Sequence, residues 1–132
     1  MFWRCCTRLR EALWRVKSQA QSAYWMRHGY ALLREQRYEE ALTAFTRALA
    51  CQAGCAPAWR SIAFIQAHLH RPLEALAAAE KALALDPTDP LAYQSKSRAL
   101  CELGRYTEAL DAYAEAQRLA PETIPALWEE VF

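Results

Sequence analysis

Side chains that could carry out chemistry are few in this chain, and they form no catalytic or metal-binding pattern. His68 and His70 flank one leucine, but no third ligand stands at a spacing that suits zinc. Cys51 and Cys55 are not a CxxC pair, and we expect them to be buried packing thiols. With only three glycines, the chain has no phosphate-binding loop. We therefore predict a non-catalytic protein with no metal site and no cofactor.

The composition favours helices. Ala and Leu dominate the 132 residues, whereas runs of Val, Ile and Thr are nearly absent. The five cysteines are an odd count and do not fit the disulfide framework of a small secreted protein. No apolar run approaches the roughly 20 residues of a membrane span, and the N-terminus lacks a secretory signal. We therefore expect an all-α, intracellular, cytoplasmic protein.

Charge is divided unevenly along the chain. Residues 1–21 carry five basic side chains and one acidic one, a net charge of +4. Residues 22–132 carry 11 basic and 14 acidic side chains, a net charge of −3. A basic N-terminal segment followed by a mildly acidic remainder indicates that the two parts have different functions. Nucleic-acid binding needs a broader basic surface, so we expect no nucleic-acid partner.

A period of 34 residues runs through most of the chain. Trp25, Trp59 and Tyr93 are separated by this step. The same step relates three further sets: Glu40, Glu74 and Glu108; Ala41, Ala75 and Ala109; and Ala48, Ala82 and Ala116. Small residues at such positions let two antiparallel helices approach closely, and the large aromatic ones fill the space opposite. The spacing therefore agrees with antiparallel helices that approach closely in each of three repeats.

This period and pattern resemble the tetratricopeptide repeat (TPR), a helix–turn–helix unit of 34 residues. The resemblance covers 22–123 in three units and implies a right-handed α-solenoid of three helix pairs. The units are 22–55, 56–89 and 90–123, preceded by a basic amphipathic helix over 1–21 and followed by a short capping helix over 124–132. Gln66 and Ala79 replace aromatic residues of the family pattern, and His28 and Lys96 replace leucines.

The expected helices follow from this register and from helix-start signals. Proline, whose missing N–H costs little at a helix start, stands at four expected starts: Pro57, Pro72, Pro90 and Pro125. The run from Asp86 to Pro90 is typical of a helix stop, a turn and a new start. The expected helices lie near 3–19, 22–35, 38–50, 56–69, 72–84, 90–103, 106–119 and 124–131.

The resemblance implies that the first helix of each pair lines a concave groove that receives a peptide or a partner helix. The side chains expected there are Arg27, Tyr30, Arg34, Arg60, Ser61, Phe64, Gln94, Ser95 and Arg98. Arginine forks suit carboxylates, and the two rings suit an apolar anchor. We therefore expect a protein or peptide partner with an acidic segment and an apolar anchor. The alternative is that the arginines merely solvate a helix face.

Some chaperone-associated members of the family hold a C-terminal carboxylate with Lys and Asn at set positions. Here the corresponding residues are Met26, Tyr30, Ser61, Leu91 and Ser95. None of them is Lys or Asn. The carboxylate clamp is therefore not expected in this chain.

Residues 2–20 form a predicted amphipathic helix outside the 34-residue pattern. Its apolar side chains recur at steps of four and three: Phe2, Cys6, Leu9, Leu13, Val16 and Ala20. Trp3 and Trp14 flank this stripe. The helix could cover the exposed side of the first repeat, or lie on an anionic membrane, where acyl chains on Cys5 and Cys6 would strengthen attachment. A removed organellar targeting helix is the third alternative.

The C-terminal segment 124–132 begins a fourth unit, with Leu127 in the aromatic position. We expect a stub helix that caps the last pair. The alternative is an acidic, aromatic tail that binds a neighbouring copy, so we expect a monomer or weak self-association.

Two functional classes therefore stay open. One is a protein-binding adaptor or co-chaperone that works through the groove. The other is a structural or assembly protein attached to a membrane or a larger complex by its N-terminal helix.

Overall fold

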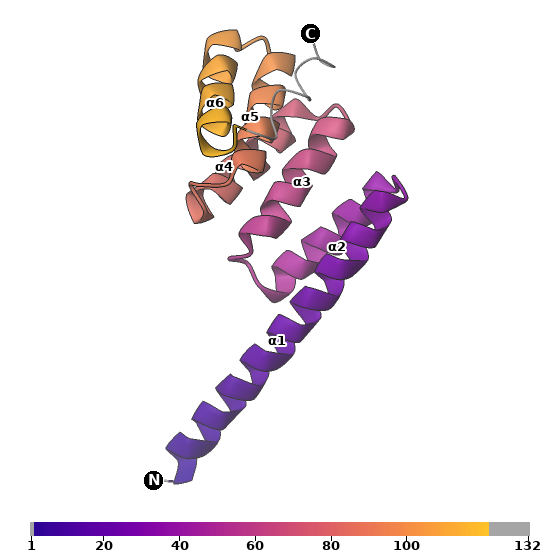
Figure 1. The fold of residues 1–132 in the computed structure, drawn as a ribbon. Coiled ribbons are helices and arrows are strands. Elements are labelled where there is room, and N and C mark those ends of the chain that lie inside the picture. The colour runs from indigo at the N-terminus through magenta and orange to yellow at the C-terminus, as the bar shows by residue number, and fades with distance from the viewer. Residues whose placement is uncertain (1, 122–132) are drawn as a thin grey trace. The chain divides into compact units, whose positions relative to one another are not determined.

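The computed structural model describes residues 2–121, and in this part of the chain every regular element is a helix. Unit 1 (Met1–Gly54) is the helix pair α1 (Phe2–Arg34) and α2 (Tyr38–Cys51). Unit 2 is Cys55–Phe132, and its described part, up to residue 121, holds four helices: α3 (Ala56–His68), α4 (Pro72–Leu85), α5 (Pro90–Glu102) and α6 (Tyr106–Leu119). Figure 1 traces these helices in order. The expected capping helix near 124–131, with Pro125, lies outside the described residues.

Helix α1 differs from the prediction, which placed two helices near 3–19 and 22–35. The structure has one helix of 33 residues instead, because no glycine or proline interrupts the chain between them. The two serines in this stretch point toward α2, where the hydroxyl of Ser18 donates to the carbonyl of Cys51. Since residues 3–17 continue α1 beyond α2, they do not fold back over the first repeat, and that expectation is wrong.

The turn inside each helix pair uses a left-handed residue at the same repeat position. Gln36, His70 and Gly104 have φ angles of 59°, 56° and 78° and are 34 residues apart. After Gln36, the N–H of Arg37 donates to the carbonyl of Leu32 at 3.0 Å, which caps the end of α1. Only one of the three positions is the glycine that this backbone favours.

Replacing Gln36 with glycine is therefore expected to raise the free energy of unfolding. A non-glycine residue in the left-handed region costs about 1–2 kcal/mol, so relief of that strain should give a gain of about 1 kcal/mol. Urea denaturation followed by circular dichroism measures the gain. The control is Gln36→Ala, which keeps the strain and should change stability little. Equal stability of the two variants would contradict the strain.

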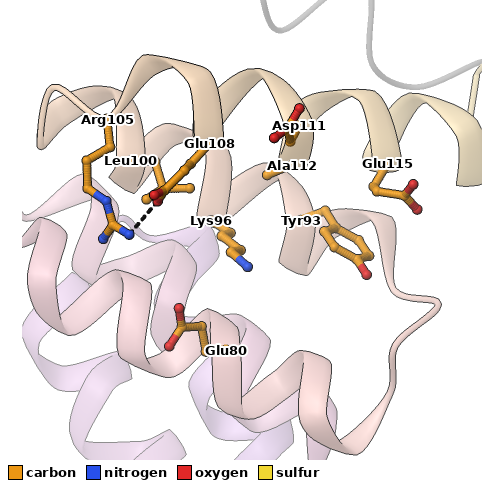
Figure 2. A pocket seen from close by; sticks show the side chains of 9 residues that line it. All are labelled: Glu80, Tyr93, Lys96, Leu100, Arg105, Glu108, Asp111, Ala112 and Glu115. Carbon is orange, nitrogen blue, oxygen red and sulfur yellow. Dashed lines mark ion pairs between the residues drawn. The ribbon is translucent and has the colours of Figure 1, made fainter.

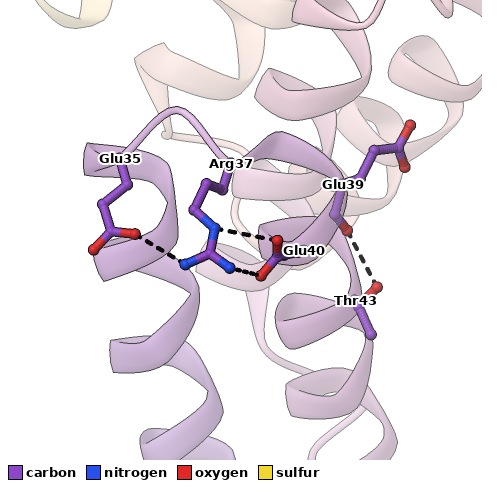
Figure 3. A network of polar contacts seen from close by, with 5 residues as sticks. All are labelled: Glu35, Arg37, Glu39, Glu40 and Thr43. Atoms are coloured by element: carbon purple, nitrogen blue, oxygen red, sulfur yellow. Dashed lines mark hydrogen bonds and ion pairs between the residues drawn. The ribbon is translucent and has the colours of Figure 1, made fainter.

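An arginine stands directly before the second helix of each pair, and a glutamate follows it three residues later. Arg37 bridges two carboxylates (Figure 3): its Nε donates to Glu40 at 3.1 Å, and a second nitrogen lies 3.1 Å from Glu35. These hydrogen bonds, the Glu40 bond first, raise the pKa of Arg37 above its usual value. Arg105 pairs with Glu108 in the same way. Glu40 and Glu108 thus accept hydrogen bonds from the arginine or pair with its charge. They also place negative charge near the positive end of the helix dipole.

The connection from α4 to α5 follows the expected stop, turn and start. Asp86 accepts hydrogen bonds from the hydroxyl of Thr88 at 2.7 Å and from its N–H at 3.1 Å, and these bonds lower the pKa of Asp86. Asp89 then caps α5, because its Oδ1 accepts from the N–H of Leu91 at 3.1 Å. Pro90 occupies the first position of α5, as predicted.

The core of unit 1 is a large ring packed against a residue without a side chain. Phe45 is fully buried among alanines of α2. A Cβ built on Gly29 would lie 2.8 Å from Cζ of this ring, so only glycine lets α1 approach α2 so closely. The ring of Tyr30 meets Phe45 edge-on, with centroids 5.3 Å apart. A side chain at position 29 would therefore require the ring of Phe45 to shift.

Unit 2 has an alanine-rich core built around two fully buried aliphatic side chains, Ile65 and Leu100. At the repeat position of Gly29 stands Ser97, whose buried hydroxyl donates to the carbonyl of Ala109 at 2.8 Å. Gln66, in a position expected to be aromatic, has an Oε1 that is buried without a hydrogen-bond partner. The departures from the family pattern thus leave the helix pairs intact.

Candidate functional site

The groove residues predicted on unit 1 lie along one side of α1. Arg27, Tyr30 and Arg34 are spaced by three and four residues, so they share a face. Both arginines are exposed, whereas Tyr30 is half-buried against Phe45. Neither arginine forms an ion pair with another described residue. Among the described residues, unit 1 therefore presents two guanidinium groups without an ion-pair partner, on the same helix face as one anchored ring.

Arg60 on unit 2 is committed to an ion pair inside the protein. A terminal guanidinium nitrogen of Arg60 lies 3.1 Å from Oδ2 of Asp89, which is only 6% exposed. Because Asp89 also caps α5, this pair ties α3 to the start of the next repeat. Arg60 therefore has a structural partner, and its charge is largely neutralised before any ligand arrives.

The two serines of the predicted groove are buried. The hydroxyl of Ser61 donates to the carbonyl of Pro57 at 2.9 Å, one turn back in α3. Ser95 is buried in α5, while Gln94 beside it is half-buried. The structure therefore does not bring the two hydroxyls to the surface, where a partner could reach them.

Two predicted groove residues of unit 2, Phe64 and Arg98, stay accessible, and each has a neighbour one turn further along its helix, His68 and Glu102. Helices α3 and α5 lie side by side, and residues 34 positions apart occupy equivalent places on them. Phe64 is thus equivalent to Arg98, and His68 to Glu102. We call these four residues the Phe64 surface. The neighbouring helices α3 and α5 thus carry an apolar ring and charged groups at equivalent positions, one pair on each helix.

Each pair of the Phe64 surface has a contact along its own helix. Phe64 is 43% exposed, and its ring centroid lies 4.2 Å from that of His68. Arg98 Nε lies 3.8 Å from an oxygen of Glu102, which is also 3.9 Å from Nδ1 of His70. The long Arg98–Glu102 distance leaves guanidinium donors available to a second carboxylate.

A separate open pocket of about 350 Å³ lies on α4, α5 and α6 (Figure 2). The residues that line it are Glu80, Tyr93, Lys96, Leu100, Arg105, Glu108, Asp111, Ala112 and Glu115. Sequence reasoning did not include these residues in a site. The available signal was Lys96, which stands where the family pattern usually has leucine. Four acidic and two basic side chains make the pocket polar, in contrast with the apolar ring of the Phe64 surface.

The cysteines and histidines singled out by the sequence do not gather in the structure. All five cysteines are free, and Cys51 and Cys55 are half-buried rather than fully buried as expected. Burial raises the pKa of the Cys101 thiol, and the charge of Glu102 raises it further. Among the described residues, no three His, Cys, Asp or Glu side chains are placed to hold a metal ion. No described helix is both long and apolar enough to cross a membrane.

Comparison with known families identifies the repeats. A tetratricopeptide repeat model matches residues 8–58 and 26–90, and a second one matches residues 78–111. The chain belongs to the tetratricopeptide repeat family. The first TPR match begins at residue 8, so it includes part of the segment that lies outside the 34-residue pattern. A search of curated protein sequences found no significant match.

Solved structures agree on the TPR fold. The Arabidopsis OM64 TPR domain is 24% identical, with a TM-score of 0.78, and the match covers 80% of this chain and 88% of that one. The second TPR of Spaghetti (RPAP3), bound to the HSP90 peptide SRMEEVD, is 23% identical with a TM-score of 0.76, over 80% and 96%. Its first TPR, bound to the same peptide, is 20% identical with a TM-score of 0.79, over 84% and 88%. The predicted all-α, TPR-solenoid fold class is confirmed.

Proposed function

We propose that this TPR protein is a non-catalytic protein-interaction module, an adaptor or co-chaperone that binds a partner segment on its first helices. The observation that carries the proposal is Phe64, a large apolar side chain that is 43% exposed within the Phe64 surface. An exposed ring on α3, with an arginine at the equivalent position of neighbouring α5, fits the centre of a binding surface, because aromatic and arginine side chains contribute much of the binding energy at such centres. The five free thiols suit the reducing cytoplasm, where we expect the protein to work.

The proposed partner is an acidic segment with an aromatic or aliphatic anchor. Arg98 offers guanidinium donors beyond its long contact with Glu102. Guanidinium groups form paired hydrogen bonds with carboxylates. The anchor side chain would pack on Phe64 while an acidic group of the same segment reaches Arg98.

Two similar TPR structures are bound to the HSP90 peptide SRMEEVD, which supports peptide binding as the class of function. We do not extend that particular peptide to this chain. The positions that hold a C-terminal carboxylate in chaperone-associated members carry no Lys or Asn here, and Ser61 and Ser95 are buried. An internal acidic segment therefore fits this chain better than a free C-terminal carboxylate.

Selection from a displayed random-peptide library tests the proposal with the protein itself as bait. We expect enriched peptides that combine acidic residues with an aromatic or aliphatic one. For the strongest of them, calorimetry should show that Phe64→Ala weakens binding about 30-fold, a typical effect of losing a central aromatic contact. Arg98→Glu should weaken it about tenfold or more, because a carboxylate would face the acidic peptide.

Matched controls separate this surface from general effects of mutation. Leu73→Ala removes an apolar side chain on α4 that is more exposed than Phe64, and Arg118→Glu reverses an exposed arginine on α6. Both should leave affinity unchanged. Arg60→Glu is unsuitable as a test because it would leave buried Asp89 without its partner. Peptides that bind Phe64→Ala and Arg98→Glu as tightly as the wild type would refute the proposal.

A further inference from the structure

The N-terminal half of α1 is a helix without a neighbour in its own unit. Contact with α2 ends near Ser18, whose hydroxyl reaches Cys51, the last residue of α2. Residues 3–17 continue α1 beyond this point (Figure 1). They extend for about 22 Å, and every one of them is exposed. We call residues 3–17 the projecting segment. It is already helical, so binding would not have to fold it.

The apolar stripe of the projecting segment does not continue the face that packs on α2. That face is marked by Ser22, which donates to the carbonyl of Ala48 at 3.3 Å, and by Ser18. At 100° per residue, the same face reaches Glu11 in the projecting segment. Leu9 and Leu13 each lie two residues from Glu11, on the opposite side of the helix. The stripe is therefore an independent surface rather than an unfinished part of the helix pair.

Exposure and charge characterise this surface. Leu9, Leu13 and Val16 are all more than 60% exposed, and Trp3 and Trp14 are 86% and 70% exposed. Helical geometry places Arg10 and Lys17 along one side of the stripe and Arg8 and Arg15 beyond its other side. None of these cations forms an ion pair with another described residue.

We propose that the projecting segment docks on an anionic membrane surface. The stripe would enter the boundary between headgroups and acyl chains, while the cations on both sides lie among the lipid phosphates and carboxylates. Tryptophan suits the same depth because its ring is apolar and its N–H is polar. The long stems of Arg10 and Lys17 let their charges reach the headgroups while the stripe is buried.

Charge placement favours lipid over another helix as the occupant. A second copy packed on the same stripe would bring its own Arg10 and Lys17 into the contact without any acidic residue to pair with them. An acidic partner helix would neutralise mainly the side of the stripe that it contacts. Anionic headgroups surround an embedded helix and can neutralise both sides at once.

Co-sedimentation of the full-length protein with vesicles tests the proposal. We expect binding to phosphatidylcholine vesicles that contain about 30% phosphatidylserine to be about tenfold or more tighter than binding to phosphatidylcholine alone, and to weaken as salt rises. The variant with Leu9→Glu and Leu13→Glu should lose most of this binding. Reversal of the flanking cations, Arg10→Glu with Lys17→Glu, should abolish the preference for anionic vesicles.

The control is a double variant of unit 2, Leu73→Glu with Leu110→Glu, which replaces two exposed leucines by glutamate. It should bind vesicles as tightly as the wild type. All these changes leave the Phe64 surface intact, so peptide binding and vesicle binding can fail separately. No binding to anionic vesicles at physiological salt, or unchanged binding by the Leu9 and Leu13 variant, would overturn the proposal. A dimer in sedimentation equilibrium that Leu9→Glu with Leu13→Glu abolishes would assign the stripe to a second copy instead.

Discussion

Replacing Phe45 with alanine is expected to lower the free energy of unfolding of unit 1 by about 3–5 kcal/mol. Phe45 is fully buried, and it is the large side chain that fills the space between α1 and α2. Its loss leaves a cavity that the small residues around it cannot close. Urea denaturation followed by circular dichroism should show a lower midpoint and the loss of the helical signal of this pair first.

The control for this prediction is Phe64→Ala, the same chemical change at a half-exposed ring. It should lower stability by only about 1 kcal/mol, because little apolar area leaves the interior. A loss from Phe45→Ala as small as that from Phe64→Ala would contradict the role of the buried ring.

Gly29 offers a second test of the same contact. Alanine is the better helix former by about 1 kcal/mol, yet Gly29→Ala should destabilise the protein, since forcing atoms into a packed core costs about 1–3 kcal/mol. Combining it with Phe45→Leu, which shortens the opposing side chain, should recover part of the loss. A stabilising Gly29→Ala would show that Phe45 can move aside.

Replacing Asp89 with alanine is the second change with a large expected effect. It removes the cap of α5, worth about 1 kcal/mol, and a charge-assisted hydrogen bond to Arg60, worth about 1.5–3 kcal/mol. We therefore expect unit 2 to lose more stability than a cap alone would explain. Chemical denaturation of the wild type and of Asp89→Ala measures the difference.

A double-mutant cycle with Arg60→Ala separates the two contributions. If the ion pair is responsible, the combined loss should be smaller than the sum of the single losses, because either change already breaks the pair. The control is Asp111→Ala, an exposed aspartate in the middle of α6, which should have little effect. Additive losses from Asp89→Ala and Arg60→Ala would indicate that the side chains act independently.

The repeat architecture could be predicted from the sequence because it depends on spacing alone. Trp25, Trp59 and Tyr93 set the register, and small residues at Ala41, Ala75 and their equivalents mark where helices meet. The prolines predicted the first residues of α3, α4 and α5 to within one residue. Such signals are local, so each can be read without knowing what lies opposite.

The candidate site could be predicted only in part. A helical face can be derived from sequence, and Phe64 and Arg98 were assigned to the groove on that basis. Whether a side chain on that face is free depends on a neighbour that is distant in the chain. Sequence reasoning could not find the partner of Arg60, because Asp89 lies 29 residues away and meets it only when two repeats stack.

The sequence by itself thus determined the helices, their pairing and the chemistry carried by each face, because helical periodicity links residues that are close in the chain. Tertiary structure decided which of those residues are available. It buried Ser61 and Ser95, committed Arg60 to Asp89 and left Phe64 exposed. It also made one helix of α1 and left residues 3–17 uncovered, since α2 ends at Cys51. Burial and ion pairing depend on contacts between distant segments, which spacing along one helix does not encode.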